Sequence, residues 1–398
     1  MALRSTTLAA AVSHVGNVRE HNEDSHLVDA DEGIFIVCDG MGGHAAGEVA
    51  SALGVRVTRE QWLGAATQKA LAEWTRAGTL DARRTALSVI KHGVMTAHRT
   101  ICEQSMADPA KKGMGTTFTG VVVAGGDAIV AHAGDSRAYL VRGGIAMQLT
   151  EDHTLLARLL AAGLPMIEGG DTHRWKGVIT NALGFGDDTK IVTFTVPLSD
   201  GDRLLLCSDG VSEYVGEAEV GQILGTQPSP ARAAQRLVEL ALERGGEDNA
   251  TALVIKVVEA GETPVPAAQR QRDDAALARC PLLQDLSPQQ RLRALRIATV
   301  RDVAAGELLP EAALESRVAW IVIDGEVMHG GATFGAGTLL YPEALLGRGA
   351  PRKADALAVT VGEVRALAVR GDDFAELSGE DPDLAEPMYA ALAKIVGG

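Results

Sequence analysis

The stretch "FIVCDGMGGH", residues 35–44, places a carboxylate where a buried strand should end. Four apolar residues, 35–38, lead to Asp39, and glycines follow it. No Lys or Arg stands within ten residues on either side, so a local ion pair does not explain the acid. An isolated negative charge at this position calls for a partner from elsewhere in the fold.

The bulk composition is that of a globular protein. The chain has 398 residues, 46% hydrophobic and 22% charged, which suggests two or three domains. Its net charge of −15 argues against nucleic acid or an anionic membrane as the main partner, and fits carboxylates that hold cations. The four scattered cysteines include no Cys-x-x-Cys pair, which argues against structural zinc and predicts a reducing, cytoplasmic setting. No apolar run approaches the ~18 residues of a membrane helix.

The chain divides into two regions around a change of composition. From 8 to 258, short β-type runs alternate with helical patterns. The stretch 259–276 has two prolines and many charges but no large apolar side chain, so we interpret it as a linker. In the second region, 277–398, Ser287 is the expected N-cap of a helix that begins at Pro288.

The pattern predicts the elements of the first region individually. The clearest expected strands are 33–40, 116–125, 128–142, 190–196, 202–210 and 251–259. The expected helices are 44–60, 82–104, 152–162, 217–225 and 230–244. Glycine pairs at 125–126 and 143–144 are typical of hairpin turns, so part of the sheet should be antiparallel.

Three further acids repeat the arrangement around Asp39. Asp209 follows the apolar run of "LLLCSDG", Asp135 follows a β-type run in "AHAGDSR", and Asp248 precedes one in "GEDNATALVI". Any one of them alone is explained as a turn residue. If the four converge on one rim of a sheet, their repulsion requires either protonation or cations. Oxygen ligands without clustered His or Cys favour Mg²⁺ or Mn²⁺ over Zn²⁺.

Six stretches resemble, in order, the motifs of the metal-dependent serine/threonine protein phosphatases, the PPM or type 2C family. They are "VGNVREHNEDS" (15–25), "DGMGG" (39–43), "GTTFTGVVV" (115–123), "HAGDSRAYL" (132–140), "LCSDGVSE" (206–213) and "GEDNATALV" (246–254). The resemblance implies a phosphatase domain over 8–258, built as an α-β-β-α sandwich with largely antiparallel sheets. It also implies two Mn²⁺ or Mg²⁺ ions between the sheets.

Carried onto this sequence, the resemblance gives each site residue a role. Asp39 would bridge the two metals, and the Gly40 carbonyl would complete one site. Asp209 and Asp248 would hold the first metal, and Glu23 would reach the second through water.

The same resemblance places Asp135 with Asp209 at a third, weaker metal site, and makes Arg19 the residue that binds the substrate phosphate. Two close divalent ions lower the pKa of a bridging water, so hydroxide becomes available for in-line attack on phosphorus. The guanidinium of Arg19 offers a planar fork of donors to the phosphoryl oxygens. Taken alone, Arg19 and Glu23 would be read as exposed charged residues.

Several residues near these motifs have open or structural interpretations. Met41 stands where some family members place a histidine that protonates the leaving group; His44 is an alternative, although a surface residue at a helix start explains it better. Cys38 and Cys207 lie inside apolar runs and are expected in the core. The segment 152–186 resembles the mobile flap of the family, with His153 at its beginning.

Two rival interpretations concern the function of the first region. "GMGGHA" (40–45) also fits the dinucleotide-binding pattern G-x-G-x-x-A, but 50–62 is predicted to be helical where that pattern expects a second strand. A catalytically weak, phosphatase-like sensor or scaffold controlled by the C-terminal domain is the other alternative. Every expected ligand position holds an acid, which favours the enzyme.

The second region, 277–398, resembles the cyclic-nucleotide-binding β-roll with flanking helices. Tyr341 and Pro342 occupy the positions of the family's Gly-Glu pair, Arg352 matches its phosphate-binding arginine, and Asp355 would repel a phosphate. We therefore expect a degenerate regulatory or protein-binding module, with nucleotide binding at Arg352 as the alternative.

Together these interpretations predict a cytoplasmic Mn²⁺- or Mg²⁺-dependent phosphatase. Its partners would be phosphoserine and phosphothreonine proteins modified by a Ser/Thr kinase, with a regulatory protein or cyclic nucleotide at the C-terminal domain. Neither nucleic acid nor a membrane is expected as a partner.

Overall fold

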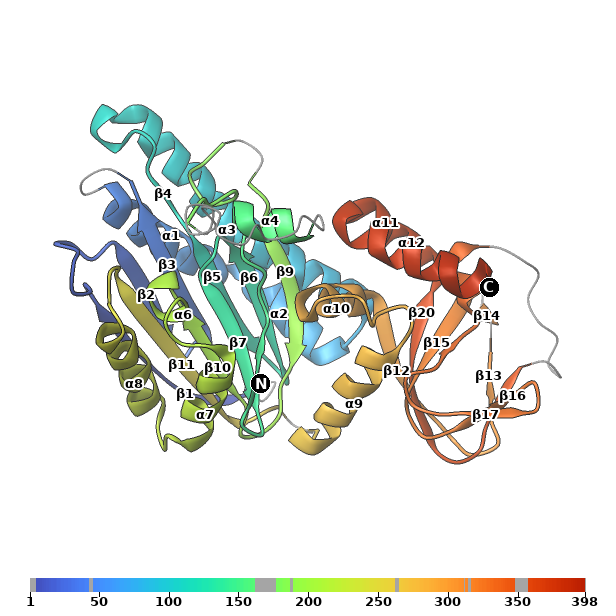
Figure 1. The fold of residues 1–398 in the computed structure, drawn as a ribbon. Helices are drawn as coiled ribbons and strands as arrows, with labels where there is room; N and C mark the ends of the chain where they lie inside the picture. Colours follow the sequence, from blue (N-terminus) through green and yellow to red (C-terminus); the bar gives the residue numbers. More distant parts are fainter. Residues whose placement is uncertain are drawn as a thin grey trace. The chain divides into compact units, whose positions relative to one another are not determined.

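The computed structural model describes residues 5–42, 46–161, 177–186, 189–261, 265–310, 312–313, 316–347 and 357–397. The chain forms two compact units, Met1–Ala267 and Ala268–Gly398 (Figure 1). No helix of the described residues is long and apolar enough to cross a membrane.

The first unit contains two antiparallel sheets. One has the strand order β1-β11-β10-β7-β8, and the other has the order β2-β3-β5-β6-β9, with β4 paired to β3. The strands are β1 (Thr6–His14), β2 (Asp24–Asp29), β3 (Ile34–Met41), β4 (Gly115–Thr116), β5 (Phe118–Ala124), β6 (Asp127–Ala133), β7 (Arg137–Arg142), β8 (Ile145–Gln148), β9 (Val192–Pro197), β10 (Arg203–Cys207) and β11 (Ala250–Glu259). The pairs of glycines at 125–126 and 143–144 connect β5 to β6 and β7 to β8, so both predicted hairpins are confirmed.

Helices cover the outer face of each sheet (Figure 1). The helices of this unit are α1 (Ala46–Leu63), α2 (Ala65–Ala77), α3 (Leu80–Ala107), α4 (Leu155–Ala161), α6 (Asp209–Ser212), α7 (Glu217–Thr226) and α8 (Pro230–Glu243), with the 3₁₀ turn η1 (Pro109–Lys111). α1, α2 and α3 contact the sheet that contains β3, and α7 and α8 contact the sheet that contains β11. The predicted layering of helix, sheet, sheet and helix is therefore present in this unit.

The strand β3 shows how the two sheets bury both of their faces. Ile34, Ile36 and Cys38 belong to the core beneath α1 and α3. Phe35 and Val37 alternate with them, point to the opposite face and are also fully buried. This double burial explains why the run before Asp39 is continuously apolar rather than alternating.

In two of the predicted runs, 128–142 and 202–210, a strand ends just before an aspartate, Asp135 in the first and Asp209 in the second. The run 128–142 is two strands, β6 and β7, because the chain turns at Gly134 with φ +114°, a value that favours glycine. The run 202–210 ends as a strand at Cys207, and Asp209 begins the short helix α6. Asp135 therefore lies in the turn after β6, and Asp209 is the first residue of the helix that follows β10.

The second unit contains two smaller antiparallel sheets. Their strand orders are β12-β20-β15-β14, with β18 paired to β15, and β13-β19-β16-β17. The strands are β12 (Ala298–Val303), β13 (Leu308–Leu309), β14 (Ala312–Ala313), β15 (Ser316–Asp324), β16 (Val327–His329), β17 (Ala332–Phe334), β18 (Leu339–Leu340), β19 (Ala358–Thr360) and β20 (Val364–Arg370). The helices are α9 (Ala267–Arg279), α10 (Pro288–Ala294), α11 (Gly371–Glu380) and α12 (Pro382–Gly397), with the 3₁₀ turns η2 (Leu295–Ile297) and η3 (Pro342–Leu346).

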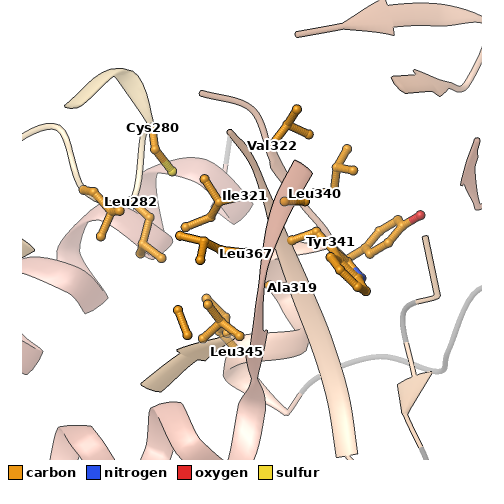
Figure 2. Packing of buried hydrophobic residues seen from close by; sticks show 14 of the residues in the cluster. Cys280, Leu282, Ala319, Ile321, Val322, Leu340, Tyr341, Leu345 and Leu367 are labelled. Atoms are coloured by element: carbon orange, nitrogen blue, oxygen red, sulfur yellow. The ribbon is translucent and has the colours of Figure 1, made fainter. Parts of the chain in front are cut away.

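One hydrophobic core holds the second unit together. Figure 2 shows Cys280 and Leu282 on one side of this cluster and Tyr341 on the other. At the start of α10, Ser287 and Gln290 form a reciprocal capping box, which confirms the predicted N-cap and the helix start at Pro288.

Half of the predicted linker 259–276 is helical. α9 begins at Ala267, directly after Pro266, and includes the rest of that stretch. Its Ala, Gln and Arg residues are good helix formers, and the Gln269 amide donates to Asp273 one turn later at 3.0 Å. Proline and charge content therefore concealed a helix in this stretch.

Candidate active site

Two aspartates face each other across the ladder of β2 and β3. Asp24 lies directly opposite Asp39 in the register of these strands. Burial raises the pKa of Asp24 to about 7. The hydroxyl groups of Thr251 and Ser208 oppose this rise, because they donate to Asp24 Oδ2 at 2.6 and 2.8 Å. Burial, followed by the charge of Asp24, raises the pKa of Asp39 well above its usual range.

Asp209 joins this pair from the other sheet. Its charge raises the pKa of Asp39, while its Oδ1 is buried and has no hydrogen-bond partner among the described residues. Burial and the charge of Asp248 raise the pKa of Asp209 to about 6. Buried carboxyl groups that raise one another's pKa values leave the site short of positive charge.

Asp135 lies in the turn between β6 and β7 and is 7% exposed. Burial raises its pKa to about 8, and the charge of Asp209 adds to the effect. The charge of Asp135 in turn raises the pKa of Asp39. The structure thus brings Asp39, Asp135 and Asp209 into one electrostatic cluster.

Asp248 is paired with Arg19. The guanidinium Nη2 lies 2.6 Å from Oδ2 of Asp248, and both side chains are partly exposed. Glu23 stands nearby: burial raises its pKa, whereas Arg19 lowers it. The carboxylate expected to hold a metal and the arginine expected to hold the phosphate are therefore direct neighbours.

Glycines allow these segments to approach one another closely. A Cβ on Gly40 would lie 2.2 Å from the Gly47 carbonyl oxygen, and the Gly40 amide donates to the Glu23 carbonyl at 3.1 Å. A Cβ on Gly47 would lie 2.5 Å from Glu23 Oε1. Only residues without side chains fit between Glu23 and the end of β3, which explains the glycines around Asp39.

Hydroxyl groups fix the backbone of Asp39. Its amide donates to Thr117 Oγ1 at 2.9 Å, and its carbonyl accepts from the Thr117 amide at 2.9 Å. Thr117 Oγ1 lies 2.7 Å from Ser136 Oγ, next to Asp135 in the chain. Both aspartates are therefore held by one buried polar network.

The chemistry of this donor set fits divalent cations. Its members are carboxylates, one with an unpartnered buried oxygen, and their pKa values are raised by one another's charge. Hard cations prefer such oxygen ligands. Among the described residues, no three His, Cys, Asp or Glu side chains form a ready-made metal-binding group. The acids form close pairs instead, with Arg19 bound to one of them.

Asp24 is the site residue that sequence reasoning missed. It stands beside Glu23 in the quoted motif, but nothing in its immediate surroundings in the sequence distinguishes it from an exposed acid. Its contacts come from Ser208 and Thr251, more than 180 residues away. The signal that could have identified Asp24 is the pairing of β2 with β3, which places Asp24 opposite Asp39.

Several other predicted residues have clear positions. Cys38 and Cys207 are buried, as expected, and burial raises the pKa of the Cys207 thiol to about 12. His153 Nδ1 lies 2.8 Å from the side-chain nitrogen of Asn181 and also accepts from the Gly134 amide. His44, Arg352, Asp355 and residues 162–176 of the expected flap lie outside the described residues.

Comparisons with known proteins identify the family of the chain. The family model described as Protein phosphatase 2C matches residues 9–250. A serine/threonine phosphatase stp of Listeria innocua is 35% identical over 244 residues, which is 61% of this chain and 92% of that protein.

Helix α1 occupies 46–63, where the dinucleotide-binding interpretation needs a strand, so that rival is wrong.

Solved structures give the same result for the fold. The Mycobacterium tuberculosis serine/threonine phosphatase PstP is 36% identical, covers 64% of this chain and 99% of its own, and has a TM-score of 0.54. A structure of the PstP catalytic domain in complex with two manganese ions has a TM-score of 0.52 at 36% identity, with the same coverage. The chain therefore belongs to the protein phosphatase 2C family and is a metal-dependent serine/threonine protein phosphatase.

Proposed function

We propose that the cluster of acids in the first unit holds the metal ions of this phosphatase. The residues that would hold two Mn²⁺ or Mg²⁺ ions are Glu23, Asp39, the carbonyl of Gly40, Asp209 and Asp248, with Asp135 and Asp209 at a third, weaker site. The single observation that carries this proposal is the buried, unpartnered Asp209 Oδ1 in a group of acids whose charges raise the pKa of Asp39. Asp24 would support the site through the hydrogen bonds that it accepts from the hydroxyl groups of Ser208 and Thr251.

The remaining side chains supply binding and orientation. When bound, divalent ions lower the pKa of water and polarise phosphoryl oxygens. Arg19, half exposed at the rim, would turn its guanidinium from Asp248 to the substrate phosphate once a cation neutralises that carboxylate. The buried thiols Cys38 and Cys207 have raised pKa values and take no part as nucleophiles in this proposal.

The test compares the wild type with Asp39→Asn in Mn²⁺-dependent phosphate release from a phosphothreonine peptide. We expect a loss of at least about 10²-fold, because one ligand would serve both ions. Activity within threefold of the wild type would exclude Asp39 as the bridging ligand. Absence of turnover in the wild type over a panel of phosphopeptides would favour the alternative of a weak, phosphatase-like sensor.

We further propose that the substrates are cytoplasmic proteins phosphorylated by a Ser/Thr kinase. None of the four cysteines forms a disulfide in the structure, and three of them are buried, which supports a reducing compartment. The raised pKa values of the thiols of Cys207 and Cys280, to about 12 and about 11, keep them protonated at neutral pH.

For 277–398, we propose a degenerate cyclic-nucleotide-binding-like β-roll that serves as a regulatory or protein-binding module. Tyr341 supports the loss of the ligand. It stands where the resemblance expects a glycine, with φ +56°, the one positive φ of a non-glycine residue in the described part of the chain. Its buried hydroxyl donates to the Leu309 carbonyl at 3.1 Å and accepts from the Ala358 amide at 2.6 Å.

The Tyr341 side chain therefore bridges β13 and β19 in the interior of the unit. Its ring also meets His329 edge-on, with the ring centroids 5.7 Å apart. Calorimetry of the full chain with cyclic AMP, cyclic GMP and cyclic di-GMP tests this proposal. We expect no binding at micromolar concentrations, and a micromolar affinity for any of the three would overturn it.

A further inference from the structure

We propose that His98 is a positioning residue of the phosphatase site, acting through the backbone of residues 183–184. His98 lies on α3, is 3% exposed and is not among the acids of the site. Its Nδ1 accepts a hydrogen bond from the Gly184 amide at 3.1 Å. The inference rests on the proposed role of Asp39 as a metal ligand.

The hydrogen bond fixes the tautomer of the imidazole. Because Nδ1 accepts, the proton of the neutral ring is on Nε2, which faces Cys102 Sγ at 3.7 Å. The thiol is one turn of α3 away, so it holds the ring from the same helix. Both ring nitrogens therefore have contacts, and the orientation of His98 is set by α3.

Gly184 lies close against α3 in a conformation that favours glycine. Its φ is +88°, and a Cβ at this position would lie 2.6 Å from Ile101 Cγ2. The amide of Gly184 is thus directed at His98 from a turn that is packed against the helix. Loss of the acceptor would leave this donor without its partner in the protein.

The residue before Gly184, Leu183, is hydrogen-bonded to β4, and β4 pairs with β3, the strand that contains Asp39. Leu183 and Thr116 exchange two backbone hydrogen bonds, Thr116 N to Leu183 O at 3.0 Å and Leu183 N to Thr116 O at 2.9 Å. Thr116 in turn pairs with Gly40 in the ladder of β3 and β4.

The chain of contacts ends on Asp39 itself. Thr116 Oγ1 lies 2.9 Å from the Asp39 carbonyl oxygen, which also accepts from the Thr117 amide at 2.9 Å. The backbone of Asp39 is therefore held from the side of α3 through a continuous series of hydrogen bonds that begins at His98. Since a ligand must be placed within about 0.5 Å of its productive position, this series bears on metal binding.

The experiment compares His98→Leu with His98→Asn, because the Asn Oδ1 occupies nearly the position of Nδ1 and retains an acceptor for Gly184. Cys102→Ala is the matched control, since it removes the contact at Nε2 and leaves Nδ1 in place. Mn²⁺ binding to the metal-free full chain is measured by calorimetry. Amide hydrogen exchange is followed in peptides spanning 181–186.

We expect His98→Leu to weaken Mn²⁺ binding about 3- to 10-fold and to accelerate exchange at 183–184, whereas His98→Asn and Cys102→Ala stay within about twofold of the wild type. A purely structural role would lower the melting temperature without this separation between Leu and Asn. Wild-type Mn²⁺ affinity in His98→Leu, or equal weakening in His98→Asn, would overturn the proposal. If His98→Leu does not fold, His98→Gln replaces it, because its acceptor lies one bond too far to meet Gly184.

Failure of the metal assignment would look different. In that case Asp39→Asn would bind Mn²⁺ like the wild type, whatever the His98 variants do. If Asp39→Asn loses Mn²⁺ binding and His98→Leu does not weaken it, the positioning role alone is wrong.

Discussion

Asp24 and Asp39 lie opposite each other in neighbouring strands, and the charge of a third acid, Asp209, acts on Asp39 as well. Like charges opposite each other in a sheet are destabilising unless something neutralises them. In the metal-free protein protons serve this purpose, and cations would replace them in the active enzyme. Stability, protonation and metal binding are therefore linked at this one position.

The metal-free protein should lose stability as the pH rises. The pKa values of Asp209, Asp24 and Asp135 are raised to about 6, about 7 and about 8, from about 3.9 in the unfolded chain. The folded state therefore binds more protons than the unfolded state across pH 4–8, and this stabilisation is lost as the pH passes through the folded values. We expect the free energy of unfolding in urea with EDTA to fall by about 1–3 kcal/mol between pH 6 and pH 8.

Mn²⁺ should reduce this pH dependence, because it replaces protons at the same oxygens. The same urea titrations in saturating Mn²⁺ provide the comparison. A metal-free stability that increases from pH 6 to pH 8 would contradict the raised pKa values.

Asp24→Asn should stabilise the metal-free protein and weaken metal binding. The Asn side-chain oxygen still accepts from Ser208 and Thr251, so the change removes a charge and keeps these contacts. At pH 8 we expect the free energy of unfolding to rise by about 1–3 kcal/mol. Asp285→Asn, at an exposed acid of the second unit, is the control and should change stability by less than about 0.5 kcal/mol. If Asp24→Asn is less stable than the wild type, the folded protein stabilises the charged form of Asp24, which contradicts its raised pKa.

Arg19→Ala should raise the KM for a phosphopeptide and leave stability nearly unchanged. The pair with Asp248 is partly exposed and contributes at most about 1 kcal/mol to folding, whereas a guanidinium on a phosphate is worth about 10- to 100-fold in kcat/KM. Arg19→Lys should recover only part of this, because an ammonium does not reproduce the planar fork. Arg56→Ala removes an arginine of similar exposure, paired with Glu60 on α1, and should not affect kinetics. If the wild type and Arg19→Ala have equal kinetics, Arg19 pairs with Asp248 but does not bind the substrate phosphate.

The acids that follow apolar strands were predictable from local sequence. Asp39, Asp135 and Asp209 each come directly after a run whose composition indicates a buried strand, and the ends of such strands meet in a sandwich. Local patterns also gave α1, α3, α7 and α8 to within a few residues. Helix α2 was missed because it is separated from α1 by Gly64 alone, so the two patterns run together.

Contacts that join distant segments were not predictable in this way. The pairing of Arg19 with Asp248 spans 229 residues, and the hydroxyl contacts of Asp24 depend on the register of β10 and β11 as well as β2. Neither leaves a periodicity in the sequence. The same holds for His98, which looks like one buried residue of a long helix until Gly184 is placed against it.

Gly47→Ala should weaken Mn²⁺ binding although alanine favours helix formation. The added Cβ would lie 2.5 Å from Glu23 Oε1, so the carboxylate must move. Gly379→Ala in α11 is the matched control, because nothing lies within 4 Å of its Cβ position; it should stabilise the protein by up to about 1 kcal/mol. Calorimetry with Mn²⁺ checks both variants. Unchanged affinity in Gly47→Ala would show that Glu23 is not a determinant of the metal site.

Tyr341→Phe should destabilise the second unit without affecting catalysis. The hydroxyl group makes two buried hydrogen bonds, to the Leu309 carbonyl and from the Ala358 amide, so its removal leaves both backbone groups without that partner. We expect a loss of about 1–3 kcal/mol in urea unfolding and faster hydrogen exchange at Ala358. Tyr389→Phe removes a partly exposed hydroxyl from α12 and should change stability by less than about 0.5 kcal/mol. If Tyr341→Phe is as stable as the wild type, the hydroxyl does not hold β13 and β19 together.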